Sequence, residues 1–254
     1  MIRRVGDAFH GAGKKVIVLL NTSAPIEVAG WENDADGILW TGLPGEQGGA
    51  AIADILSGKV NPSGKLAETW PVHYSDVPDY GILPKSPHTP ATYSEGIYVG
   101  YRYYDTKNVK PFYHFGYGLS YTTFSYSNLA LSKPAFDLAK AGETITVTAT
   151  VKNTGKVAGR EVAELYIHEN NPVIDRPFKE LKGFAKAKLL QPGETARVSF
   201  VIDKRALSYF KPDPITEAGW TADPANFTIY VGGTSDSDVL SQKGRGMPAT
   251  LEAK

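Results

Sequence analysis

The sequence predicts an α/β unit, built on a partial open parallel sheet, followed by an all-β sandwich. Two observations carry this prediction. The first seventy residues contain two continuous apolar runs separated by glycine-rich turns, which is typical of parallel strands buried on both faces. After about Ser125, short alternating segments are separated by turn signals, which is typical of an antiparallel sandwich. A chain of 254 residues is long enough for two modest domains with their own cores.

The α/β part is expected to begin with the end of a helix that Gly11 and Gly13 close. Its later elements alternate between apolar strands and helices with turn residues at their ends. In order, they are a strand over Lys15–Leu20, a short helix over Pro25–Ala29, a strand over Asp36–Thr41, a turn over Gly42–Gly49 and a helix over Ala50–Ser57. A turn that follows a strand and precedes a helix is where open α/β sheets bind ligands.

The middle of the chain is predicted to connect the two parts. An edge strand is expected over Ala67–Val72, and residues 74–90 are expected to form a long ordered loop. Tyr93–Asp105 then holds five tyrosines, two glycines and one arginine. Because buried tyrosine hydroxyls need hydrogen-bond partners, this segment is interpreted as a seam between packed domains, with alternate rings buried as in a strand. The expected divisions are therefore residues 1–72, 73–124 and 125–254.

The last part alternates most clearly over Glu143–Lys152, which places Ile145, Val147, Ala149 and Val151 on one face. Glu161–His168 alternates with an off-phase Val162, which indicates a β-bulge. Further strands are expected over residues 178–190, 195–202 and 226–232. Roughly seven short strands suggest an immunoglobulin-like sandwich, and the absence of the cysteines that such domains share makes fibronectin type III the closer analogue.

Composition excludes several classes of function. Lys and Arg number 27, as do Asp and Glu, so no basic field attracts nucleic acid or an anionic membrane. No apolar run reaches the length of a membrane span. The five histidines lack metal-ligand spacing, and neither a phosphate-binding loop nor another cofactor motif is present. The lack of cysteine and of a visible signal peptide favours a cytoplasmic location, although a processed chain would look the same.

Acid/base hydrolysis by carboxyl groups needs two acids that flank the scissile bond, and the sequence does not compel such a pair. Glu46 is the best-placed acid, because it follows a strand and precedes a helix. The favoured interpretation of Glu46 is nevertheless the ordinary one, a first-turn acid that the helix dipole stabilises. Glu95 is expected to pair with Arg102 as a structural salt bridge, and the acids at positions 32, 34 and 36 are expected to be solvated. No catalytic residue is assigned.

Several motifs nevertheless occur in the order found in one enzyme family. They are Lys14-Lys-Val-Ile-Val-Leu-Leu-Asn21, Leu43-Pro-Gly-Glu-Gln-Gly-Gly49, Asn61-Pro-Ser-Gly-Lys-Leu66, the tyrosine segment, Phe115-Gly-Tyr-Gly-Leu-Ser-Tyr121 and Arg176-Pro-Phe-Lys-Glu-Leu-Lys-Gly-Phe184. Over almost its whole length the chain resembles the C-terminal part of a family 3 glycoside hydrolase, the β-glucosidase family. The resemblance implies the second half of an α/β sandwich domain, a connecting segment and a fibronectin type III-like domain.

In that family a (β/α)8 barrel carries the nucleophilic Asp, and an earlier part of the α/β sandwich domain carries the acid/base Glu. The resemblance implies that both lie outside this chain. We therefore expect a retaining β-glucosidase, acting on a β-glucoside or oligosaccharide, to be completed by upstream sequence, by a partner chain with the barrel or by a homodimer mate. Trp40, Glu46 and Gln47 would then line the pocket edge.

The alternative is a non-catalytic carbohydrate-binding or scaffold module. It would use exposed stacking aromatics, for which Trp31, Trp70 and Trp220 are candidates, although burial is the commoner fate of such residues. Xylosidase and N-acetylglucosaminidase specificities also remain open, because the pocket that selects among them lies mostly on the barrel.

Overall fold

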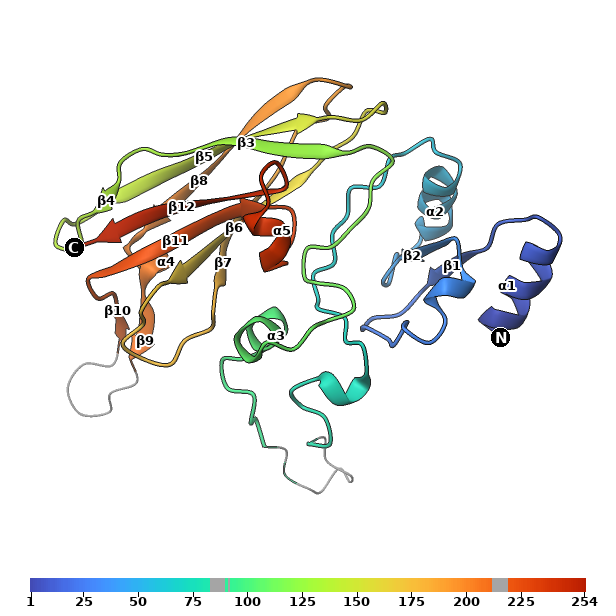
Figure 1. The fold of residues 1–254 in the computed structure, drawn as a ribbon, viewed down its shortest axis with the longest axis horizontal. Helices are drawn as coiled ribbons and strands as arrows, with labels where there is room; N and C mark the ends of the chain where they lie inside the picture. The colour runs from blue at the N-terminus through green and yellow to red at the C-terminus, as the bar shows by residue number, and fades with distance from the viewer. Residues whose placement is uncertain (83–89, 91, 212–218) are drawn as a thin grey trace.

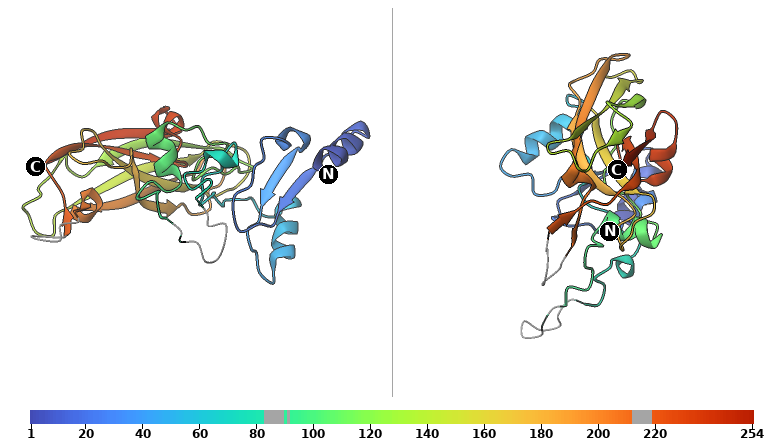
Figure 2. Two further views of the ribbon diagram at one scale, coloured as in Figure 1. Left: turned by 90° about the horizontal axis from the view of Figure 1, so that it is seen from below. Right: turned by 90° about the vertical axis from the view of Figure 1, so that its left-hand side faces the viewer.

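The computed structural model describes residues 1–82, 90, 92–211 and 219–254. It shows a small α/β unit and a larger β-sandwich at opposite ends of an elongated molecule, with the connecting segment between them (Figures 1 and 2). No helix in these described ranges is long and apolar enough to span a bilayer.

The α/β unit contains a two-stranded parallel sheet flanked by helices. Its elements are α1 (Ile2–Gly11), β1 (Ile17–Leu20), the 3-10 helix η1 (Glu32–Asp34), β2 (Gly37–Trp40) and α2 (Gly48–Leu56). The parallel pairing that the apolar runs predict is confirmed, because Ile17 lies opposite Gly37 and Leu20 opposite Trp40. The helix predicted over Pro25–Ala29 is wrong. That stretch is irregular, and it places the side chain of Val28 in a small core with Leu20 and Trp70.

One face of this sheet is not covered. Burial on both faces was the prediction for β1, and it holds for Leu20, which is buried. It is wrong for Ile17 and Leu19, whose exposed fractions are 50% and 45%. Two strands and two helices supply too few layers to cover both faces of a parallel sheet. Ile17 and Leu19 therefore leave apolar side chains exposed on this face of the sheet.

The connecting segment holds the 3-10 helix η2 (Tyr74–Asp76) and the helix α3 (Tyr101–Lys107). The edge strand predicted over Ala67–Val72 is wrong, because only a single bridge forms there, between Trp70 and Tyr113. The loop predicted over residues 74–90 includes η2, and residues 83–89 of it lie outside the described residues.

The end of the tyrosine segment, from Tyr101 onward, folds as a helix, and residues 93–100 are irregular, so the strand-like alternation that the sequence suggested does not form. Gly100 precedes α3 with a φ of +56°, and Asn108 ends it in the left-handed conformation. Helical geometry projects side chains at different angles, so Tyr101 reaches the sandwich while Tyr104 is buried. The Tyr101 hydroxyl accepts a hydrogen bond from the Leu181 amide at 2.7 Å. The segment therefore contacts the sandwich through Tyr101, whereas its predicted strand periodicity is wrong.

The sandwich packs a five-stranded sheet of order β4-β12-β11-β6-β7 against a three-stranded sheet of order β3-β5-β8, and β9 and β10 form a separate hairpin (Figure 1). The strands are β3 (Phe124–Leu131), β4 (Ala135–Phe136), β5 (Thr144–Asn153), β6 (Val162–Glu169), β7 (Glu180–Lys186), β8 (Thr195–Asp203), β9 (Tyr209–Lys211), β10 (Gly219–Thr221), β11 (Ala225–Gly232) and β12 (Gly246–Ala253). The short helices α4 (Lys204–Leu207) and α5 (Ser237–Ser241) flank them.

The core of the sandwich follows the predicted alternation. Ile145, Val147, Ala149 and Val151 of β5 are all buried in it. A bulge does occur in the pairing of β6 with β7, but the register shifts between Leu165 and Tyr166 and the extra residue, Lys182, lies on β7. The predicted position at Val162 of β6 is therefore wrong. The side chains buried in this core are aliphatic and aromatic. The hydrophobic effect therefore holds the two sheets together.

Candidate functional site

The carboxyl ends of β1 and β2 place two loops at one edge of the parallel sheet. Residues 21–31 follow β1, and residues 41–47 follow β2. The Thr41 amide donates to the Leu20 carbonyl at 2.9 Å, which joins the two loops where they leave the strands. This is the edge at which open α/β sheets bind ligands, and all three residues predicted to line a pocket lie on it.

Trp40 has a structural role at this edge. Its indole nitrogen donates to the Thr22 carbonyl at 3.0 Å, which ties the end of β2 to the loop after β1. Its ring meets that of Trp70 edge-on, with centroids 5.9 Å apart. Because the only indole donor is already used, Trp40 could offer a ligand its half-buried ring but no further hydrogen bond.

Glu46 and Gln47 lie in the turn between β2 and α2, and both side chains are exposed. The turn closes tightly, because a Cβ atom on Gly48 would lie only 2.6 Å from Cγ of Pro44. Gln47 occupies the N-cap position of α2, yet its side chain makes no capping hydrogen bond. The turn therefore presents a carboxylate and an amide to the outside at the loop edge of the sheet.

The loop after β1 is tied to the connecting segment. The Glu27 carboxylate accepts a hydrogen bond from the Tyr74 amide, and the Trp31 indole donates to the Glu27 carbonyl at 3.0 Å. Glu27 is thus a bracing residue, which the sequence did not single out.

Two of the acids predicted to be solvated, Asp34 and Asp36, instead form ion pairs. Asp36, at the opposite edge of the sheet, makes the most contacts. Its carboxylate accepts hydrogen bonds from Lys15 Nζ at 2.6 Å and from the Val16 amide at 2.8 Å. It also contacts His10 Nε2 at 2.9 Å. The Lys15 hydrogen bond, followed by those of Val16 and His10, holds the pKa of Asp36 well below its usual range. This cluster attaches α1 to the sheet, and it lies too far along the strands to belong to the loop edge.

The predicted Glu95–Arg102 salt bridge does not form. Arg102 pairs with Glu180 of β7, with Nη2 and Oε1 3.1 Å apart. Arg102 is in α3, so the arginine bonds the connecting segment to the sandwich rather than to its own sequence neighbour. Sequence spacing favoured the local partner because it carries no information on which strand lies against the helix.

Two polar clusters at the same seam were missed. One joins Lys179, the residue before β7, to Asp105 of α3, and the other joins Lys65 to Glu161 and the neighbouring Glu164. Buried lysines and glutamates are uncommon unless paired, and nothing in the local sequence marks these as buried. The one feature of the sequence that could have indicated them is the segment rich in tyrosine and glycine that packs over them.

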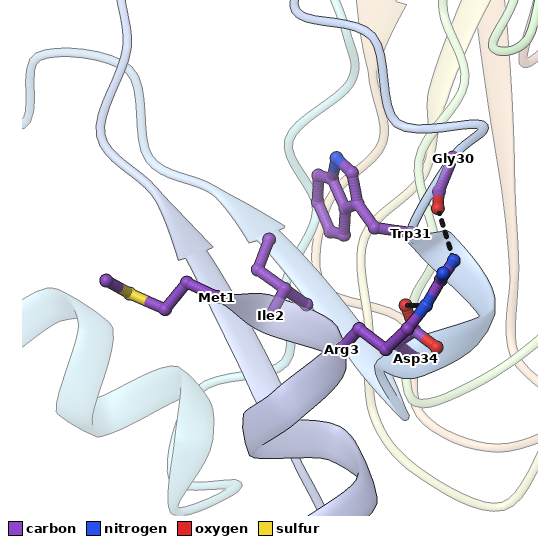
Figure 3. Close-up of a pocket in the computed structure, with 6 residues that line it drawn as sticks. All are labelled: Met1, Ile2, Arg3, Gly30, Trp31 and Asp34. Atoms are coloured by element: carbon purple, nitrogen blue, oxygen red, sulfur yellow. Dashed lines mark hydrogen bonds and ion pairs between the residues drawn. The ribbon is translucent and has the colours of Figure 1, made fainter.

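A shallow depression beside α1 is formed by Met1, Ile2, Arg3, Gly30, Trp31 and Asp34 (Figure 3). Arg3 donates to the Gly30 carbonyl at 3.2 Å and to Asp34 at 3.4 Å. The one carboxylate here is therefore already paired, and none of the three predicted pocket residues lines this depression. It does not have the chemistry of a glycosidase site, which needs a free nucleophilic carboxylate and a second acid.

A second depression lies at the far end of the sandwich, and its acids are engaged as well. Glu143 forms ion pairs with Lys133 and with Lys140, and Asp203 caps α4 through the Ala206 amide. Within the described ranges, no group of three or more His, Asp or Glu side chains is placed to hold a metal ion. The loop edge with Glu46 and Gln47 thus remains the best candidate site, as an incomplete one.

Comparison with protein families matches both parts of the chain. Residues 3–121 match the glycosyl hydrolase family 3 C-terminal domain, and residues 161–235 match a fibronectin type III-like domain. Among curated relatives, the thermostable β-glucosidase B of Acetivibrio thermocellus is 43% identical over 242 residues, which is 95% of this chain and 31% of that protein. A β-glucosidase of Bacteroides ovatus is 39% identical over 92% of this chain and 30% of its own length.

Solved structures of β-glucosidases are similar to this chain in fold as well as in sequence. β-Glucosidase 3B from Thermotoga neapolitana, in complex with α-D-glucose, superposes with a TM-score of 0.86 at 42% identity, covering 99% of this chain and 33% of that one. A β-D-glucoside glucohydrolase from Trichoderma reesei gives a TM-score of 0.82 at 32% identity, with coverage of 99% and 35%. The chain therefore spans about a third of the length of the relatives it matches. Its fold, its motifs and both domain matches show that the chain belongs to glycoside hydrolase family 3, as the C-terminal domain with its fibronectin type III-like domain.

Proposed function

We propose that this chain is the C-terminal component of a retaining β-glucosidase that hydrolyses terminal β-D-glucosyl residues. The nucleophilic Asp and the acid/base Glu would come from sequence outside this chain, either upstream or on a partner that carries the (β/α)8 barrel. A homodimer mate that completes the sheet is a further possibility. In this proposal residues 1–72 belong to the α/β sandwich domain, 73–124 connect the domains and 125–254 form the fibronectin type III-like domain.

The observation that carries the proposal is the uncovered face of the two-stranded sheet. Ile17 and Leu19 expose about half of their side chains there, and Val5 and Phe9 of α1 are similarly exposed. Apolar side chains gathered on one face of a parallel sheet need a covering layer. Relatives three times as long, named as β-glucosidases, have the additional sequence that could supply it.

The loop edge gives the proposed assembly its pocket contacts. Glu46 and Gln47 are exposed at the carboxyl end of the sheet, and Trp40 is the last residue of β2. An exposed carboxylate and amide suit hydrogen bonds to sugar hydroxyls. We assign these three residues to positioning at the pocket edge and not to proton transfer or nucleophilic attack.

One observation favours the alternative of a carbohydrate-binding module. Trp220 is 48% exposed and lies opposite Phe210 in the β9–β10 hairpin, with ring centroids 5.5 Å apart. The other two candidate tryptophans are less suited, since Trp70 is buried and the Trp31 indole is hydrogen-bonded to the protein. The Arg205 guanidinium already lies 3.2 Å from the Trp220 ring centroid, so one face of that ring is occupied. The enzyme component therefore has the stronger support.

Complementation tests the proposal. This chain would be mixed with the part of the Acetivibrio thermocellus β-glucosidase that precedes the matched region, and hydrolysis of p-nitrophenyl-β-D-glucoside followed. We expect activity that neither piece shows alone. The double variant Ile17→Asp, Leu19→Asp should fail to complement, whereas Val201→Asp, at a 63% exposed position on the sandwich, should complement fully. Equal complementation by both variants would show that the apolar face is not the assembly surface.

A further inference from the structure

A second feature lies outside the proposed pocket, where the connecting segment meets β6 of the sandwich. Lys65 Nζ lies 3.0 Å from Glu161 Oε1, and Glu164 follows three residues later, just inside β6. Glu164 is buried, and its Oε2 atom accepts a hydrogen bond from the Tyr166 hydroxyl at 2.7 Å. Two glutamates thus lie in one desolvated seam with a single lysine, and that lysine is bonded to the other glutamate.

Glycines of the connecting segment cover this carboxylate closely. A Cβ atom on Gly116 would overlap the Glu164 carboxylate, at 2.8 Å from Oε1 and closer still to Oε2. A Cβ on Gly118 would lie 2.6 Å from the Gly64 carbonyl oxygen. The backbone around Gly116 therefore rests directly on the Glu164 side chain, and no water-sized space separates the two.

Three backbone hydrogen bonds hold the segment in this position. The Gly116 amide donates to the Leu66 carbonyl at 2.8 Å, and the Leu66 amide donates to the Tyr117 carbonyl at 2.9 Å. The Ser235 amide donates to the Phe115 carbonyl at 2.8 Å, which attaches the segment to the turn after β11. Of these three bonds, the one from Ser235 joins the segment to the sandwich, so the Ser235 amide reports whether the segment is docked.

We propose that Glu164 is a pH-sensitive latch, which holds residues 115–118 on the sandwich while its carboxyl group is protonated and releases them when it ionises. A protonated carboxyl group carries no charge and fits under the Gly116 backbone. An ionised one needs water or a cation, and both are supplied only if the covering segment moves away. This device is independent of the proposed enzyme assembly, since every group in it belongs to this chain.

The charged and titratable groups around Glu164 support this behaviour. Burial raises its pKa from 4.5 to about 7, the Tyr166 hydrogen bond and the Lys65 charge lower it in part, and the Glu161 charge raises it further. Tyr126 of β3 faces the same cluster, and its hydroxyl donates to Glu161 Oε1 at 3.3 Å. Beyond the Tyr166 ring lies Lys179, 6.0 Å from the ring centroid, whose charge is paired with Asp105.

The sign of the pH effect follows from proton linkage. Between about pH 4.5 and 7 the docked state keeps a proton that the undocked carboxyl group has released. The free energy that this proton contributes to docking therefore falls as the pH rises through this window. Above about pH 7 that contribution is lost completely. Docking should accordingly be tightest in mild acid and weakest in mild alkali.

Hydrogen exchange of the full chain tests the latch. Protection of the Ser235 amide would be measured at pH 5.5 and 8.5, after correction for intrinsic exchange rates. We expect protection to fall roughly thirtyfold over this interval, from the linkage of a pKa shifted from 4.5 to about 7. In Glu164→Gln, which keeps the shape and can accept from Tyr166 but cannot ionise, protection should be the same at both pH values.

Glu252→Gln is the matched control, because Glu252 is an exposed acid of the same sheet and should leave the wild-type pH dependence unchanged. Constant protection in the wild type would overturn the latch. So would an undiminished fall in Glu164→Gln, or a fall that disappears in Glu252→Gln as well. If Glu164→Gln does not fold, a carbon-13 NMR titration of the wild-type side chain decides the matter, since a Glu164 pKa below 5.5 would contradict the proposal.

Discussion

Nζ of Lys179, the residue before β7, lies 2.6 Å from Oδ2 of Asp105 in α3, in an ion pair from which solvent is almost excluded. The lysine side chain is 0% exposed and the aspartate 7%. Ser237 Oγ accepts a second hydrogen bond from the ammonium group at 2.8 Å. The residues are 74 positions apart in the chain, so their pairing fixes where the connecting segment sits on the sandwich.

Replacing Lys179 with Met should destabilise the protein by about 3–5 kcal/mol, because it leaves the Asp105 charge buried without a partner. Urea denaturation measures this loss. Lys188→Met is the control, since its pair with Glu194 is exposed and its removal should not change the denaturation midpoint measurably. Equal midpoints for Lys179→Met and the wild type would show that the seam does not depend on this pair.

Gly246 should not tolerate even a methyl group. A Cβ atom there would overlap the backbone of Leu240, which neither rotates away nor compresses. We expect Gly246→Ala to destabilise the sandwich by roughly 1–3 kcal/mol, the usual effect of overpacking, as measured by thermal unfolding. Gly49 is the contrasting position, because it lies in α2 with open space around it, and Gly49→Ala should be neutral or stabilising.

The attachment of α1 should weaken in acid. The pKa of Asp36 is held below its ordinary 3.8 by Lys15, Val16 and His10, so its contribution is present above that value and is lost as the pH falls below it. Exchange of the α1 amides at pH 6 and pH 3 measures this change. Asp36→Asn should have low α1 protection at both pH values, and a wild-type helix equally protected at both would contradict the assignment.

Glu46 should affect substrate binding but not the chemical step. In the complemented enzyme, we expect Glu46→Gln to raise KM severalfold and leave kcat nearly unchanged, which is the signature of a contact equally strong in the ground and transition states. Asp54→Asn, at an acid of α2 paired with Lys59, serves as the control and should change neither constant. A large fall in kcat for Glu46→Gln would place this residue in the chemistry.

The sequence predicted the structure best where a single local pattern, such as the alternation of apolar and polar residues along a strand, determined which side chains are buried. The alternation in β5 is strict because one face meets the core, so its buried residues could be named from the sequence. β12 was missed, since Gly246 and Pro248 discourage a strand assignment. Pro248 is tolerated because β4 pairs with β12 only at Glu252 and Ala253, which leaves the Pro248 position on an open edge.

The functional edge was harder to predict. Strand order and glycine turns placed Trp40, Glu46 and Gln47 near one another, but they could not show that the Trp40 indole is committed to Thr22. Similarly, the tyrosines indicated a seam, yet which charges it buries depends on contacts between residues as far apart as Asp105 and Lys179. Such pairs are set by tertiary packing, which local sequence does not encode.

The most direct test of the central claim is hydrolysis of p-nitrophenyl-β-D-glucoside by the purified chain alone. The proposal places both catalytic carboxylates on sequence outside this chain, so it predicts no turnover above the buffer blank. Clear turnover that disappears in Glu46→Gln would contradict it, because the chain would then contain a complete site with Glu46 as one of its catalytic acids.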